Sequence, residues 1–290
     1  MNNSKMLITI IVIFLILIIL WVFFNIIARN DKIASEKYDL EKDGVVILKN
    51  VFSNDEIRFF KREFEQNHYS SLKTALMGSR LLGCLQEKLP ISIRNGYVLQ
   101  DYIWIIKKSS VHTCHRDNNG DFFNAGQKYP SYTILIYLED MEKCLGVIPQ
   151  SHLERGSYGF NASDNVVNLL CSAGDIILFN ANLIHVGAMN KKDDNLRIQM
   201  KLSHKDDLQV LSYYQDYNKI LKNDNTVPTE IRRLQKNFSC MFPFLSDMTQ
   251  TENIASARGS DNGAEIGFFQ KAFSYIFYGN SNFYDLPNAF

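Results

Sequence analysis

Three side chains, His115, Asp117 and His185, have the types and the order needed to hold a metal ion. Two imidazoles and one carboxylate are the protein ligands of non-heme Fe(II) sites that leave three coordination positions open. Because residues i and i+2 of a strand project to the same face, His115 and Asp117 can bind one ion together. His185 lies 70 residues after His115, just after a predicted strand. That distance is enough for a later strand to come back beside His115 and Asp117. The pattern predicts an iron site.

An arginine, Arg197, lies 12 positions after His185, across a polar turn at residues 190–195. Hairpin geometry would bring it beside His185 on the neighbouring strand. Its planar, permanently charged guanidinium can bind a carboxylate through two hydrogen bonds. Arg197 is therefore predicted to bind the far carboxylate of an organic acid that occupies the open metal positions.

Each of these short motifs also has an ordinary explanation. A His-x-Asp triplet occurs by chance, and a lone histidine is usually a surface or capping residue. What favours a site is the order: pair, strand, histidine, turn, arginine. Of the other histidines, His152 is expected to fix a loop, and His68 and His204 are expected at the surface.

The elements that must position these residues follow from hydrophobic patterning. A capping box at Ser53-Asn-Asp-Glu56 predicts a helix, and a second helix is expected over 72–89. β-Branched and aromatic runs bounded by turn residues predict strands at 44–48, 97–107, 132–139, 175–179 and 196–202. Short strands after two helices predict a mainly β fold with flanking helices, a double-stranded β-helix (jelly roll, cupin-like).

The last predicted strand, 196–202, has two different faces. Apolar residues alternate with Arg197, Gln199 and Lys201, so that one face is apolar and the other polar. The polar face either lines a site or is solvated, and the pattern leaves both interpretations open.

The N-terminal segment 6–27 contains no charged residue and is mostly Ile, Leu, Val and Phe. As a helix it would reach about 33 Å, against roughly 30 Å of bilayer hydrocarbon. No small-x-small cleavage site follows, so an uncleaved single-pass transmembrane helix is predicted rather than a signal peptide. Lys5 on one side and Arg29, Lys32 and Lys37 on the other place the C-terminal part on the cytosolic side.

The charge balance, the cysteines and the residue patterns along the chain complete the predicted organisation. Lys+Arg and Asp+Glu both total 31, so a nucleic-acid partner is not expected. Five cysteines without a Cys-x-x-Cys spacing agree with a reducing compartment. The predicted division is a tail (1–5), a membrane anchor (6–27), a linker (28–42), a jelly-roll domain (43–204) and a helical, aromatic-rich extension packed on that domain (205–290).

Four stretches of the chain resemble the phytanoyl-CoA dioxygenase-like family of Fe(II)/2-oxoglutarate-dependent oxygenases. They are 43–57, His115-Arg-Asp117, 137–152 and 174–197. The resemblance implies that His115, Asp117 and His185 bind Fe(II) and that Arg197 binds 2-oxoglutarate. Thr133 is either a second contact for 2-oxoglutarate or a packing residue of the core. The resemblance also implies a hydroxylase that converts 2-oxoglutarate to succinate and CO₂, with ascorbate as reductant.

The sequence departs from the family pattern at Gln150, where a glycine usually precedes Ser-His. The substrate is not indicated and is expected to be a small molecule, a lipid or a protein. Two other functions stay open: a catalytically degenerate jelly-roll binding module and a prolyl-hydroxylase-like protein hydroxylase. The latter commonly has a lysine where Arg197 is expected to act.

Overall fold

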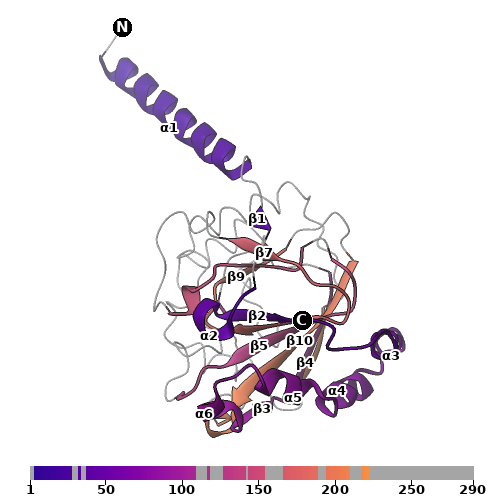
Figure 1. Ribbon diagram of the computed structural model, residues 1–290. Coiled ribbons are helices and arrows are strands. Elements are labelled where there is room, and N and C mark those ends of the chain that lie inside the picture. The colour runs from indigo at the N-terminus through magenta and orange to yellow at the C-terminus, as the bar shows by residue number, and fades with distance from the viewer. Residues whose placement is uncertain are drawn as a thin grey trace.

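Two β-sheets and a set of helices make up this computed structural model (Figure 1). It describes residues 3–27, 32–33, 37–108, 116–117, 127–141, 143–153, 166–188, 194–209 and 217–221. In the large sheet the strand order is β11-β4-β10-β5-β8-β2, and β3 also pairs with β10. The order in the small sheet is β1-β7-β6-β9.

The strands are short, and most pair antiparallel. Those of the large sheet are β2 (Val45–Leu48), β3 (Tyr97–Leu99), β4 (Tyr102–Lys108), β5 (Tyr132–Tyr137), β8 (Ile176–Asn180), β10 (Asp194–His204) and β11 (Tyr217–Leu221). Those of the small sheet are β1 (Lys32–Ile33), β6 (Leu145–Val147), β7 (Val167–Leu169) and β9 (His185–Gly187). Only β1–β7 and β4–β11 are parallel among the described pairs. The predicted mainly β fold of the jelly-roll kind with flanking helices is thus confirmed.

The α-helices that the structure describes all come before β3 in the chain, with β1 and β2 lying among them. They are α1 (Asn3–Ile27), α2 (Leu40–Asp43), α3 (Asn54–Glu65), α4 (Tyr69–Met77), α5 (Leu81–Gln86) and α6 (Ile91–Arg94), with 3₁₀ turns at Ser151–Leu153 and Lys205–Asp207. The capping box of α3 is formed as predicted, with the Ser53 side chain and Glu56 bonded reciprocally. The predicted helix 72–89 is two helices, because the chain breaks after Met77, where Gly78 caps α4.

The large sheet separates two hydrophobic cores. Alternate residues of β5, β8 and β10, such as Ile134, Leu178 and Met200, pack with the helical residues. The opposite faces, including Leu135 and Phe179, pack with the strands of the small sheet. In Figure 1, α3 to α6 accordingly lie on one side of the large sheet and β7 and β9 on the other. A strand of the large sheet therefore has one face toward the helices and one toward the interior between the sheets.

The C-terminal prediction is wrong where the structure describes that region. Tyr217–Leu221, within the extension predicted to be helical, forms β11 and pairs in parallel with β4. Pairing with β4 satisfies the backbone N–H and C=O groups of this segment. The aromatic residues of the extension give no indication of that partner strand. Residues 222–290 lie outside the described part, and the remaining domain divisions stay predictions.

The predicted membrane anchor at 6–27, and the membrane location derived from it, require correction. Across the part of the chain that the structure describes, no helix combines the length and the apolar character of a membrane span.

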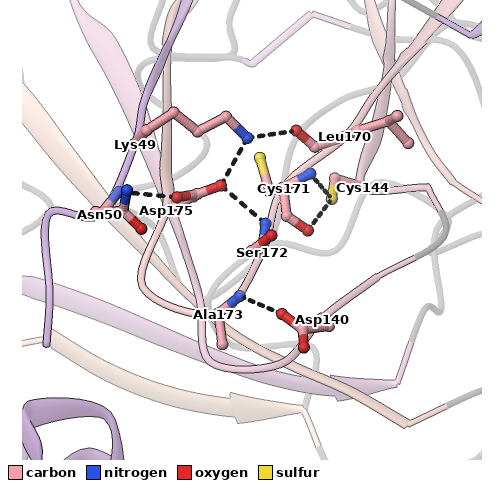
Figure 2. Close-up of polar contacts among 9 residues, drawn as sticks. All are labelled: Lys49, Asn50, Asp140, Cys144, Leu170, Cys171, Ser172, Ala173 and Asp175. Atoms are coloured by element: carbon pink, nitrogen blue, oxygen red, sulfur yellow. Dashed lines mark hydrogen bonds and ion pairs between the residues drawn. The ribbon is translucent and has the colours of Figure 1, made fainter. Parts of the chain in front are cut away.

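A buried carboxylate, that of Asp175, joins the end of β2 to the start of β8 (Figure 2). Its Oδ2 accepts hydrogen bonds from the Lys49 ammonium at 2.7 Å and the Ser172 backbone N–H at 2.8 Å. Its Oδ1 accepts one from the Asn50 backbone N–H at 2.9 Å. The side chain is 1% exposed, so these donors replace water. These contacts fix Asp175, the residue directly before β8, and β8 leads to the turn that precedes His185.

We expect Asp175→Ala to lower the free energy of unfolding by about 2–4 kcal/mol, because it removes the acceptor of three donors in a buried turn. Urea denaturation followed by circular dichroism measures this loss. Asp140→Ala is the matched control, since the exposed Asp140 accepts one bond in the same turn, from the Ala173 N–H. The control should cost less than about 1 kcal/mol. Equal losses in both variants would contradict the anchoring role of Asp175.

Candidate active site

A pocket between the two sheets contains three of the predicted site residues, Asp117, His185 and Arg197. These residues lie far apart in the sequence: Asp117 belongs to the described pair 116–117, His185 to β9 and Arg197 to β10. The pocket is also lined by mostly apolar side chains, namely Trp104, Ile106, Leu135, Cys144, Leu145 and Phe179, together with Gly187 and Gln199. The tertiary structure thus brings the predicted polar residues together in one partly apolar hollow.

Asp117 and His185 face each other across this pocket. Oδ1 of Asp117 lies 3.6 Å from Nε2 of His185, and both side chains are largely buried. The backbone N–H of Asp117 donates to the carbonyl of Ala181 at 2.9 Å, which holds this segment against the turn between β8 and β9. That turn leads directly into His185, so one short stretch of chain positions both groups.

The ring of His185 is fixed by two contacts. Its Nδ1 lies 2.9 Å from the carbonyl oxygen of Leu183, and a carbonyl only accepts, so Nδ1–H donates. The ring also packs against Phe179, with centroids 4.7 Å apart. A neutral imidazole that donates through Nδ1 keeps the lone pair of Nε2 for another partner, as metal-binding histidines do.

These two side chains fit a metal ion. Two bonds of about 2.1 Å can reach one first-row divalent ion from Oδ1 and Nε2 across the 3.6 Å that separates them. Within the described ranges, no three or more His, Cys, Asp or Glu side chains are grouped so that they could hold an ion. The third predicted ligand, His115, lies outside the described residues. The three-residue ligand set therefore stays a prediction, with two of its members brought together.

Arg197 occupies the centre of the large sheet. On β10 it pairs with Ile106 of β4 on one side and with Tyr137 of β5 on the other. Burial lowers the pKa of its guanidinium, and the neighbouring Tyr137 opposes that shift. A cation in a desolvated pocket binds a carboxylate more strongly than an exposed one does. Arg197 thus lines the pocket, and its binding of an organic acid stays a prediction.

Sequence reasoning missed one residue of this site, Lys201. Its ammonium lies 2.6 Å from Oδ2 of Asp117 and 2.7 Å from Oγ1 of Thr133, and the side chain is 2% exposed. The hydroxyl of Thr133 in turn donates to Oδ2 of Asp117. Lys201, Gln199 and Arg197 share the polar face of β10; Lys201 is buried, and Arg197 and Gln199 line the pocket, so this face lies between the sheets rather than at the outer surface. The alternation of apolar and polar residues over 196–202 was the sequence signal that could have indicated Lys201.

Thr133, predicted as a second contact for 2-oxoglutarate, is completely buried on β5. The structure places its hydroxyl on Asp117 and Lys201. A contact with 2-oxoglutarate stays a prediction.

The Ser-His loop supports the turn that carries His185. Oγ of Ser151 accepts from the Ile184 backbone N–H at 2.9 Å and donates to the Ile148 carbonyl at 2.7 Å. His152 donates from Nε2 to the Glu41 carbonyl at 3.0 Å, as expected of a histidine that fixes a loop. Gln150 adopts a φ of 70°, a left-handed conformation that favours glycine. Its backbone conformation explains why a glycine suits this position.

The two remaining described histidines differ from each other. His68 precedes α4 with its side chain 58% exposed, as predicted. His204 was predicted at the surface but is 7% exposed, with its ring against those of Tyr97 and Tyr129. The aromatic partners are distant in sequence, so the local pattern did not indicate them.

The match to a protein family agrees with this geometry. Residues 96–198 match the family described as phytanoyl-CoA dioxygenase (PhyH). The matched segment includes all five predicted site residues. The resemblance predicted from the motifs is therefore confirmed over this segment.

Among solved structures, the chain is similar to HygX from Streptomyces hygroscopicus with nickel and 2-oxoglutarate bound. That match has 16% identity and a TM-score of 0.46, and it covers 57% of this chain and 84% of HygX. EvdO2 from Micromonospora carbonacea var. aurantiaca matches with 11% identity and a TM-score of 0.44, covering 60% and 94% of the two chains. The non-heme alpha ketoglutarate dependent epimerase SnoN from nogalamycin biosynthesis matches with 15% identity and a TM-score of 0.44, covering 57% and 78%. No curated protein matches the chain.

Replacement of Asp117, His185 or His115 by alanine should weaken Mn(II) binding by at least about 100-fold. Loss of an outer-shell partner alone costs 10–100-fold, and the loss of a ligand should cost more. Isothermal titration calorimetry of the full chain measures the affinity. The control is His68→Ala, which removes an exposed histidine and should bind Mn(II) like the unmodified chain. Unchanged affinity in the His115 variant would remove that residue from the ligand set.

Proposed function

We propose that the protein is an Fe(II)- and 2-oxoglutarate-dependent oxygenase that hydroxylates an organic substrate and releases succinate and CO₂. The observation that carries the proposal is the opposition of Asp117 Oδ1 and His185 Nε2 in a pocket that Arg197 also lines. The match of residues 96–198 to the phytanoyl-CoA dioxygenase family supports it.

In this proposal Asp117, His185 and His115 hold the iron, which supplies O₂ activation when bound. Three protein ligands leave three positions, which suffice for a chelating keto acid and O₂. Arg197 binds the distal carboxylate of 2-oxoglutarate and so orients it toward the metal. Ascorbate acts as the reductant that maintains the ferrous state.

The pocket's own side chains restrict what can enter. Trp104, Ile106 and Leu135 form apolar walls that limit the access of water to the reacting centre. The substrate class stays open between a small molecule, a lipid and a protein, and the balanced charge of 31 basic and 31 acidic residues does not favour a nucleic acid.

Two other functions differ from this one in what they require. A degenerate binding module would need neither an intact ligand pair nor a desolvated arginine beside it. A prolyl-hydroxylase-like enzyme commonly binds 2-oxoglutarate through a lysine, whereas here Arg197 lines the pocket and Lys201 is bonded to Asp117. The position of Arg197 and the bond between Lys201 and Asp117 both favour an oxygenase that binds 2-oxoglutarate through an arginine.

The full chain with Fe(II), ascorbate and 2-oxoglutarate should produce succinate slowly even without its substrate, through uncoupled turnover. Asp117→Ala and His115→Ala should produce none above the level of free iron, because the metal is no longer held. Succinate is quantified by mass spectrometry, with His68→Ala as the active control. Turnover in the Asp117 variant equal to that of the unmodified chain would reject the proposed oxygenase site, whereas no succinate above the level of free iron from the unmodified chain would favour the binding module.

Arg197→Lys should raise the KM for 2-oxoglutarate at least about 10-fold, because a point charge replaces a two-pronged donor. The KM is measured by succinate formation at saturating Fe(II). Arg58→Lys makes the same change at an exposed arginine of α3 and should leave the KM unaltered. An unaltered KM in the Arg197 variant would place the distal carboxylate elsewhere.

A further inference from the structure

The carboxylate of Asp117 is held asymmetrically, with its two oxygens in different surroundings. Oδ2 accepts from Lys201 at 2.6 Å and from the Thr133 hydroxyl, while Oδ1 faces His185 at 3.6 Å. The third side of the triangle, Lys201 Nζ to Thr133 Oγ1, is 2.7 Å. Three mutually bonded groups fix the rotation of the carboxylate about its own axis.

The sheet determines this triangle. Lys201 and Thr133 are directly paired in the register of β10 and β5, and they lie 84 and 16 residues from Asp117 along the chain. Both side chains are almost completely buried, at 2% and 0% exposure. A buried ammonium is costly unless it is paired with an anion and hydrogen-bonded, so Lys201 and Asp117 hold each other in place.

We propose that Lys201 is a positioning residue which, with Thr133, restricts Asp117 to a single metal-binding oxygen and so preserves a coordination position that 2-oxoglutarate needs. The inference deepens the proposed function and rests on it. A carboxylate can bind a metal through one oxygen or both, as it does in calcium sites. If Oδ2 were released from Lys201, it could turn toward the ion and take one of the three positions otherwise open.

The two consequences of that release differ in size, which allows a test. The metal would keep all of its protein ligands and gain Oδ2 as a further one, which offsets the loss of an outer-shell partner, so its affinity should change little. The keto acid would compete with Oδ2 for a position, so its affinity should fall. A split between the two affinities distinguishes positioning from general loosening of the fold, which would weaken both.

The test uses the full chain and measures Mn(II) affinity first, then 2-oxoglutarate affinity of the Mn(II)-loaded protein, both by calorimetry. In Lys201→Met, Mn(II) affinity should stay within about threefold of the unmodified chain, while 2-oxoglutarate affinity should fall at least about 10-fold, the equivalent of one charge-assisted hydrogen bond. Thr133→Val should reduce 2-oxoglutarate affinity by a smaller factor, and Thr133→Ser, which keeps the hydroxyl, should restore it.

Several outcomes would overturn the inference. Unaltered 2-oxoglutarate affinity in Lys201→Met would do so, as would proportional loss of both affinities in both variants. A fall in Lys201→Met with no effect of Thr133→Val would assign Lys201 a direct contact with the keto acid instead. An unmodified chain that binds neither Mn(II) nor 2-oxoglutarate would reject the proposed function itself, whereas failure of the split alone would leave that function standing.

Discussion

The structure depends on one strand, β10, that serves two environments at once. Its apolar face, with Ile198, Met200 and Leu202, packs into the core shared with the helices. Its polar face, with Arg197 and Lys201, points into the interior between the sheets. Since a slip of one residue would exchange the two faces, the hydrophobic core that fixes the register also fixes the chemistry.

Charge compensation is the second constraint on this interior. A lysine and an arginine on the same buried face of a strand would repel each other and lose hydration without anionic partners. Asp117 compensates Lys201 at 2.6 Å, and the pocket beside Arg197 can admit a carboxylate. Because a buried ion pair adds little to stability compared with apolar packing, the Lys201–Asp117 pair is better explained by a role in the site than by stabilisation of the fold.

Geometry at the site is set largely by backbone contacts of the turn between β8 and β9. This turn supplies the Ala181 carbonyl that holds Asp117 and the Leu183 carbonyl that orients His185. Ser151 of the Ser-His loop braces the same turn through Ile184. The Ser-His loop therefore acts on Asp117 and His185 indirectly, through the turn that positions them. This support explains why the Ser-His loop accompanies the predicted ligand residues in the sequence.

Much of the fold was predictable from local pattern. The capping box of α3 satisfies helix N–H groups with residues three positions apart, and the alternation in β10 depends only on the two-residue period of a strand. The break between α4 and α5 and the pairing of β11 with β4 were not predicted. The pairing of β11 depends on a partner strand that the local pattern does not specify, whereas Gly78 at the end of α4 was an available local signal for the break.

The sequence by itself determined which residues could act and which of them share a strand face, because side-chain chemistry and backbone periodicity are local properties. Only the tertiary structure decided that the polar face of β10 is interior, and that Lys201 meets an aspartate 84 positions away. Those outcomes depend on the second sheet covering the first and on the register between β5 and β10. Long-range pairing selects one among many arrangements that the local pattern allows equally.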